Sequence, residues 1–226
     1  TGHIDDPAMR SWLADRLERA ASAPEADVRR NALIQLVRAE TFERFLGTKA
    51  PTKKRFGAEG AEAVVPLLHR ILERAAALGV DDVVIASMHR GRLNLMVNTL
   101  QLAPVEMLHA FAGKHPFPLD GDRAADVPYH LGIEAVLNLA GRAVRVSLCP
   151  NPSHLEAVNP VGIGRVRARQ DVASRSGGDA ARTLGIVLHT DASVIGQGSV
   201  SEVVQLGQLQ AYGTCGTIHI VINNQI

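Results

Sequence analysis

The sequence predicts an α/β fold built on a doubly wound parallel sheet, and two observations support this. First, four short apolar runs alternate with stretches of helical periodicity, and they begin at Val83, Ala143, Leu184 and Thr217. Second, residues 184–226 read as strand, small-residue turn, helix and strand. Such a unit joins two parallel strands by a right-handed crossover. Alternation of this kind along the chain is typical of a parallel sheet with helices on both faces.

Composition limits the classes of protein that fit. A length of 226 residues suits one large domain with an N-terminal extension. The 24 basic and 23 acidic residues give a formal net charge of +1, so we expect neither nucleic acid nor an anionic membrane surface as a partner. No apolar run approaches the roughly 20 residues that cross a bilayer. Two cysteines are too few for a disulfide framework and fit a reducing compartment.

Residues 1–50 predict a helical N-terminal segment, which we interpret as a prefix without chemistry of its own. Apolar residues recur at helical spacing on both sides of a break at residues 22–24. Phe42, Phe45 and Leu46 would pack the second helix onto the sheet. Residues 51–226 form the predicted α/β domain. Because the sequence stops straight after a strand, we expect this domain to be truncated at its C-terminus.

The segment MHRGRLN, residues 88–94, follows the strand that begins at Val83. His89, Arg90 and Arg92 would therefore lie at the carboxyl edge of the sheet, where open α/β sheets bind ligands. Histidine can hold and release a proton near neutral pH, and arginine presents a fork that matches carboxylate or phosphate. The group suits an anionic substrate. The alternative is a helix start whose arginines face water.

A stretch rich in turn formers occupies residues 112–126, after a predicted helix over residues 105–111. A loop of that length in a compact domain is often functional. It leads into VPYHLG, residues 127–132, which contains His130. A lone histidine in a loop is more often structural or exposed, so this segment alone leaves the role of His130 open.

The strand that begins at Ala143 ends in CPNPSHLEAVNP, residues 149–160. Ser153 and Glu156 have the spacing of a capping box, and the helix start that they predict would be an anion site. His154 would lie in its first turn, where the helix dipole favours the neutral imidazole. Asn159 and Pro160 predict the start of a further helix over residues 161–170.

Two further strand ends predict a metal site. Asp191 follows one strand and Asn224 follows the next, so these side chains should come close together. A carboxylate, an amide oxygen and a backbone carbonyl, completed by phosphate oxygens and water, suit Mg²⁺. Between them, glycines and a helix opened by a Ser199–Glu202 capping box offer backbone N–H groups to a diphosphate. The alternative is an ordinary turn in which Asp191 caps a helix.

These motifs resemble a known family. Asp191 followed by the pair Asn223–Asn224 is similar to the thiamine diphosphate motif of transketolase-like enzymes. HRGRLN, NPSHLE and IHIVINNQ together resemble the first, decarboxylating component of 2-oxoglutarate dehydrogenase, from about residue 40 to the end. The resemblance implies the diphosphate-binding half of the thiamine diphosphate-binding fold.

The resemblance also implies an activity: oxidative decarboxylation of 2-oxoglutarate in the tricarboxylic acid cycle, with succinyl transfer to the lipoyl group of a partner acyltransferase. Mg²⁺ would be held by Asp191, Asn224 and the carbonyl of Ile226. The residues that would bind thiamine diphosphate are Arg90, Ser153, Leu155, Asp191, Ala192, Ser193 and Asn224. His89, His130 and His154 would handle substrate carboxylates and protons. A homodimer in the bacterial cytoplasm or the mitochondrial matrix is also implied, as is a cofactor-activating glutamate in a downstream domain.

Two positions depart from the family pattern. Thr190 stands where the family has glycine, and Glu134 stands where it has serine. A carboxylate would repel a dicarboxylate substrate, so Glu134 must point away, or the substrate differs. These departures leave two alternatives: a dehydrogenase for 2-oxoadipate or another 2-oxo acid, and a regulatory pseudoenzyme that keeps the fold without the cofactor.

Overall fold

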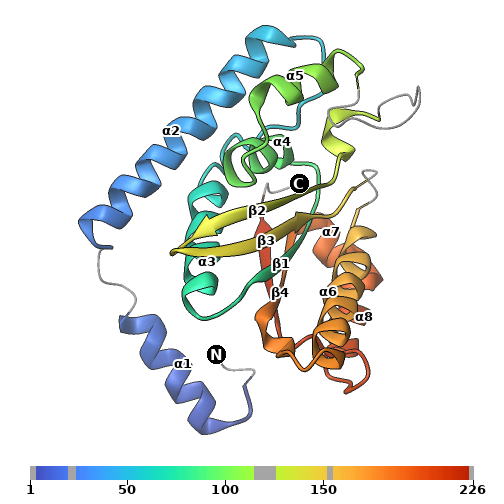
Figure 1. Cartoon of the computed structure of the whole chain (residues 1–226). Coiled ribbons are helices and arrows are strands. Elements are labelled where there is room, and N and C mark those ends of the chain that lie inside the picture. Colours follow the sequence, from blue (N-terminus) through green and yellow to red (C-terminus); the bar gives the residue numbers. More distant parts are fainter. Residues whose placement is uncertain (1–3, 20–23, 115–125, 152–154, 224–226) are drawn as a thin grey trace.

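A five-stranded sheet forms the centre of the protein (Figure 1). The structure is a computed structural model, and it describes residues 4–19, 24–114, 126–151 and 155–223. The strand order is β2-β3-β1-β4-β5, and β1, β3, β4 and β5 are parallel. The strands are β1 (Asp82–Ser87), β2 (Ile133–Leu139), β3 (Arg142–Leu148), β4 (Thr183–Thr190) and β5 (Thr217–Ile222). The predicted α/β class and its four parallel strands are confirmed.

The edge strand β2 is absent from the sequence-based prediction. It pairs antiparallel with β3, from Ile133 opposite Leu148 to Leu139 opposite Arg142. The connecting residues Ala140 and Gly141 have φ values of 51° and 76°, the left-handed pair that a two-residue hairpin turn requires. Buried and exposed residues alternate towards the end of β2. This alternation of burial every second residue is typical of a strand and could have been recognised in the sequence.

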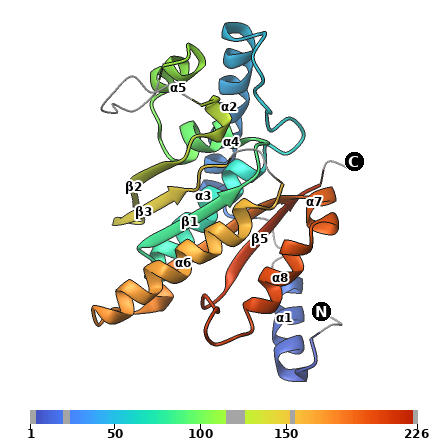
Figure 2. The ribbon, with the colours of Figure 1, turned by 90° about the vertical axis from the view of Figure 1, so that its right-hand side faces the viewer.

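Helices cover both faces of the sheet. Figure 2 shows α6 (Val158–Arg175) lying across one face, and α3 (Val64–Ala77) lies behind the opposite one. All six residues of β1 are buried. Val83 and Ile85 pack on the side of α3, whereas Val84 and Ala86 pack on the side of α6. Burial on both faces explains why this strand reads as a continuous apolar run.

A glycine brings α6 close to the end of β1. A Cβ atom on Gly162 would lie 2.7 Å from the Cβ of Ala86, a separation that no side chain tolerates. Without a side chain there, the helix start can settle directly on the strand. This contact places the turn before α6 beside the carboxyl edge of the sheet.

The N-terminal segment contains the two predicted helices, α1 (Pro7–Arg19) and α2 (Ala26–Lys49). The described part of α1 has no buried residue. Helix α2 packs against α3 and α4, and not directly on the sheet as predicted. Phe42 and Leu46 are buried in the core, as expected, but Phe45 is exposed. The position of a domain boundary near residue 50 stays a prediction.

Three predicted helix starts are wrong. Helix α8 (Gly198–Leu206) begins before Ser199, its N-cap is Gln197, and no side chain caps it. Residues 155–157 form a turn in place of the expected short helix, and the carboxylate of Glu156 points elsewhere. Asn159 lies inside α6 because that helix begins at Val158. Ser153 and His154 lie outside the described residues.

The remaining elements are short. Residues expected to form a turn after β4 instead form a helix, α7 (Asp191–Gly196). The others are α4 (Arg92–Asn94), η1 (Leu95–Thr99), α5 (Pro104–Phe111), η2 (Pro128–His130) and η3 (Ala180–Arg182). Among the described residues, no helix combines the length and the apolar character that crossing a membrane would require.

Candidate active site

The carboxyl ends of the parallel strands meet at one edge, as predicted. Leu188 of β4 pairs with Ser87 of β1, and Thr190 pairs with Ile222 of β5. Asp191, which begins α7, therefore lies at the end of the strand next to the one that Asn223 follows. Asn224 and Ile226 lie outside the described residues, so the proposed metal ligation stays a prediction.

Arg92 ties three segments together below this edge. Its side chain is fully buried, and its guanidinium donates to Ser87 Oγ at 2.9 Å, to the Leu131 carbonyl at 2.6 Å and to the Cys149 carbonyl. Burial lowers the pKa of Arg92 to about 10, so the group stays charged at neutral pH. The expectation that Arg92 faces an anionic substrate is wrong, because its fork is occupied by the protein.

Two of the predicted histidines lie in one group of rings, which we call the aromatic cluster: Phe56, His89, Tyr129 and His130. The ring centroids of Phe56 and His89 are 4.3 Å apart, and those of Phe56 and Tyr129 are 4.9 Å apart. Tyr129 in turn contacts His130 at 4.9 Å. The structure thus links His89 to His130 through Phe56 and Tyr129, and sequence reasoning missed Phe56.

Charge and burial tune the histidines of this cluster. Burial, with Arg90 and His130 nearby, lowers the pKa of His89, so its imidazole is neutral at pH 7. His130 Nδ1 lies 2.9 Å from Asp126 Oδ2. Burial raises the pKa of Asp126, but hydrogen bonds from His130 and from the backbone N–H of Val127 outweigh it and lower the pKa overall. Asp126 therefore orients the His130 ring.

A second group, which we call the carboxylate network, lies under the ends of β4 and β5: Glu156, His189, Thr190, Ser193 and His219. Glu156 accepts hydrogen bonds from Ser193 Oγ at 2.8 Å and from His189 Nδ1 at 2.8 Å. His189 Nε2 lies 2.9 Å from His219 Nδ1, and the two rings stack. His189 is 0% exposed and Glu156 is 6% exposed, so the inner part of this network is shielded from water, whereas His219 is exposed.

The protonation of the network follows from its geometry. Burial raises the pKa of Glu156, but hydrogen bonds from His189 and Ser193 outweigh it, so the pKa is lowered and the carboxylate is ionised. An ionised Glu156 requires Nδ1 of His189 to carry a proton. His189 Nε2 and His219 Nδ1 share the hydrogen bond between the two rings, and its direction depends on their tautomers. Burial and the neighbouring His189 lower the pKa of His219, and this agrees with a neutral ring.

Thr190 is accommodated within the carboxylate network. Its Oγ1 lies 2.7 Å from Ser193 Oγ, and its backbone has an extended conformation with φ −99° and ψ 152°. Any residue adopts that conformation, so the backbone at this position does not demand glycine. Ser193 is buried with its hydroxyl in the network, whereas Ala192 and Leu155 are exposed at the same edge.

Glu134 points towards α6. Its Oε2 accepts from Ser147 Oγ at 2.6 Å and from Arg169 Nη2 at 2.8 Å. The Ser147 hydrogen bond, more than the effect of Arg169, holds the pKa of Glu134 below its usual range. An ionised Glu134 is thus neutralised by Arg169, and it is removed from contact with a substrate at the aromatic cluster.

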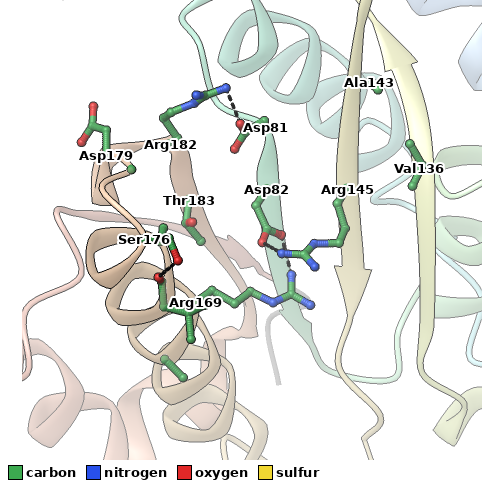
Figure 3. A pocket seen from close by; sticks show the side chains of 14 residues that line it. Asp81, Asp82, Val136, Ala143, Arg145, Arg169, Ser176, Asp179, Arg182 and Thr183 are labelled. Carbon is green, nitrogen blue, oxygen red and sulfur yellow. Dashed lines mark hydrogen bonds and ion pairs between the residues drawn. The ribbon is translucent and has the colours of Figure 1, made fainter.

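A large cavity lies away from the predicted active site. Among the described residues, a cavity of about 750 Å³ opens between α6 and the amino-terminal ends of the strands, opposite the predicted edge. Figure 3 shows Arg145 and Arg169 both reaching Asp82, and Arg182 reaching Asp81. Arg145 and Arg169 together balance Asp82 and Glu134, and Arg182 balances Asp81, so we assign the cavity a structural role.

Comparison with known proteins agrees with this geometry. Residues 35–226 match the family described as "Dehydrogenase E1 component", whose members depend on thiamine diphosphate. The chain is 42% identical to the "2-oxoglutarate dehydrogenase E1 component" of Azotobacter vinelandii over 99% of its own length and 23% of that protein. The proteins of that name from Cupriavidus necator and Haemophilus influenzae are 41% and 40% identical, again over 99% of this chain but only 23% and 24% of theirs. The chain spans about a quarter of the length of these relatives, and it belongs to the dehydrogenase E1 component family.

Proposed function

We propose that the protein containing this chain catalyses the oxidative decarboxylation of 2-oxoglutarate, with thiamine diphosphate and Mg²⁺, and transfers the succinyl group to a lipoyl group of a partner acyltransferase. One observation carries the proposal: the aromatic cluster, Arg90 and Asp191 converge on one carboxyl edge of a parallel sheet. The printed names of the relatives support the choice of substrate.

The residues present fit a magnesium diphosphate. Asp191 and Asn223 directly follow the adjacent strands β4 and β5. Their side-chain oxygens are suitable metal ligands at the carboxyl ends of these strands. The Nε atom of Arg90 is buried and makes no hydrogen bond with the described residues. A phosphate oxygen would satisfy this donor, and burying it otherwise carries a cost. We infer that Mg²⁺ is held by Asp191, Asn224 and the carbonyl of Ile226. Arg90, Ser153, Leu155, Ala192 and Ser193 would line the cofactor.

When bound, thiamine diphosphate supplies the electron sink that decarboxylation needs. The chain contributes the substrate surroundings. His89 is neutral, so it can accept a proton or offer a hydrogen bond. Asp126 holds His130 in a fixed orientation, and the rings of Phe56 and Tyr129 exclude water beside both histidines. His154 would complete the group.

The structure weakens the support for both alternatives. Glu134 is paired with Arg169, so it gives no reason to prefer a substrate other than 2-oxoglutarate. Thr190 was the sole support for a pseudoenzyme, and its side chain fits among the hydrogen bonds of the carboxylate network. We extend the proposal to a homodimer and, because the relatives are bacterial, to a place in the bacterial cytoplasm.

The test is an assay of the full-length protein on 2-oxoglutarate and on 2-oxoadipate, with an artificial electron acceptor in place of the lipoyl partner. We expect turnover of 2-oxoglutarate that needs both thiamine diphosphate and Mg²⁺. Faster turnover of 2-oxoadipate would identify the paralogue. Cofactor binding without turnover of either acid, or no cofactor binding at all, would contradict the proposal. Light scattering of the same preparation tests the homodimer.

A further inference from the structure

We propose that Glu156 is a positioning residue that fixes Asp191, through the backbone on either side of it, against the turn between β3 and α6. The proposal rests on the proposed function, because it assigns a purpose to the residues around the metal site. Glu156 does not touch the cofactor in this account. It acts through the segment that carries the metal ligand.

The two carboxylate oxygens of Glu156 accept hydrogen bonds from residues on both sides of Asp191. Oε2 accepts from His189, two residues before Asp191, and Oε1 accepts from Ser193, two residues after it; both distances are 2.8 Å. Ser193 Oγ also lies 3.0 Å from the carbonyl of Thr190. A single carboxylate thus spans the junction between β4 and α7. This junction cannot shift relative to Glu156 without breaking a buried, charge-assisted hydrogen bond.

The same carboxylate reaches the neighbouring strand. His189 hydrogen-bonds Glu156 on one side and His219 of β5 on the other. Strand β5 leads directly to Asn223 and Asn224. Glu156 itself lies in the turn that follows residues 152–154. One side chain therefore connects three of the four chain segments that supply the proposed cofactor ligands, the fourth being the one that carries Arg90.

The backbone at Glu156 is unfavourable for its residue type. Its φ of 43° lies in the left-handed region, which costs about 1–3 kcal/mol for residues other than glycine. Burying its carboxylate adds a desolvation cost, so the presence of this buried charge is weak evidence for stability. Glutamate at this position is better explained by the geometry that it imposes than by the stability that it adds.

The experiment compares three variants of the full-length protein: Glu156→Ala, Glu156→Gln and Glu134→Ala. Glu134 is the matched control, because its carboxylate also accepts hydrogen bonds from one serine hydroxyl and one side-chain N–H but does not contact the Asp191 segment. Calorimetry gives the affinity for Mg²⁺ with thiamine diphosphate, and thermal melting gives the stability. Residues that orient metal ligands typically change metal affinity by about 10–100-fold when removed.

We expect Glu156→Ala to weaken cofactor affinity by about 10–100-fold. Glutamine can accept from His189 and donate to Ser193, so Glu156→Gln should restore affinity to within a few-fold of the unmodified protein. Glu134→Ala should lower the melting temperature and leave affinity unchanged. If Glu156→Ala does not fold, His189→Leu removes one of the two hydrogen bonds of the carboxylate at a residue that does not line the cofactor. It should weaken binding measurably, by less than about tenfold.

Three results would overturn the proposal. Unchanged affinity in Glu156→Ala, or in His189→Leu where the first variant does not fold, shows that the carboxylate does not position the site. Equal losses in Glu156→Ala and Glu134→Ala show a general loosening of the fold. Failure of the unmodified protein to bind thiamine diphosphate or Mg²⁺ refutes the proposed function, and this inference with it. The first two results leave the proposed function standing.

Discussion

The aromatic cluster and the carboxylate network share one edge of the sheet, but they are held together by different forces. The rings of Phe56, His89, Tyr129 and His130 touch one another, and all four residues are half-buried. The network instead consists of hydrogen bonds of 2.7–3.0 Å, with Glu156, His189 and Ser193 buried. Ring contacts tolerate small displacements, whereas buried hydrogen bonds do not.

We infer from this difference that the carboxylate network serves cofactor binding and the aromatic cluster serves the substrate. A diphosphate and its metal ion demand fixed ligand positions, and the network supplies a fixed frame. An organic acid needs a wall that excludes water and a histidine of suitable pKa, and the aromatic cluster supplies both. Substitutions should therefore distinguish the two groups. Those in the aromatic cluster should impair turnover, and those in the carboxylate network should impair cofactor binding.

The largest difference between the effect on turnover and the effect on cofactor binding should come from His89→Ala and His130→Ala in the full-length protein. Both side chains would face the substrate, so kcat should fall by about 10²–10⁴-fold, the range for positioned proton-transfer groups. Calorimetry should find nearly unchanged affinity for thiamine diphosphate. Equal loss of cofactor affinity in both variants would show that the two groups are wrongly assigned.

The next largest effect should come from Arg92→Met, because Arg92 joins the ends of β1 and β3 beneath both groups. The variant leaves buried acceptors without donors, at about 1–3 kcal/mol each, so unfolding should become easier by about 3 kcal/mol or more. Denaturant titration measures this. Arg90→Met is the control, with expected stability within about 1 kcal/mol of the unmodified protein. Similar losses in the two variants would contradict the structural role of Arg92.

The dependence of kcat/KM on pH should report on the aromatic cluster and not on the carboxylate network. The pKa of His89 is lowered from 6.5, so its neutral form persists below pH 6.5 and is lost only as the pH falls through the lowered pKa. Because Glu156 has a pKa lowered from 4.5, it stays ionised across this window. We expect kcat/KM of the full-length protein to fall in acid with a midpoint below 6.5. His89→Gln should remove this limb, and its persistence would assign the titration to another group.

The smallest effect should come from Phe56→Leu. Leucine keeps an apolar side chain between His89 and Tyr129 but loses the ring contacts, which are worth about 0.5–1.5 kcal/mol each. We expect a rise in KM for 2-oxoglutarate of roughly tenfold or less, with cofactor affinity unchanged. A rise in the dissociation constant of thiamine diphosphate would show that the two groups are mechanically coupled.

Local patterns predicted the parallel strands and the meeting of their ends, because an apolar run that begins at Val83 or Thr217 carries its own signal. They failed for Glu156. Its spacing from Ser153 suits a capping box, but its partners, His189 and Ser193, lie more than 30 residues further on. Phe56 was missed for the same reason, since the basic run before it predicts a solvated loop and its contacts are long-range. Strand β2 was missed although its alternation and its Ala140–Gly141 turn were readable.

The proposed function depends most on one feature, a Mg²⁺ ion held by Asp191 and Asn224 at the carboxyl edge of the sheet. A crystal structure of the full-length protein with thiamine diphosphate and Mg²⁺ tests it most directly. We expect an oxygen of each side chain at roughly 2.0–2.1 Å from the ion. An ion bound elsewhere, or the two side chains on opposite faces of the sheet, would contradict it.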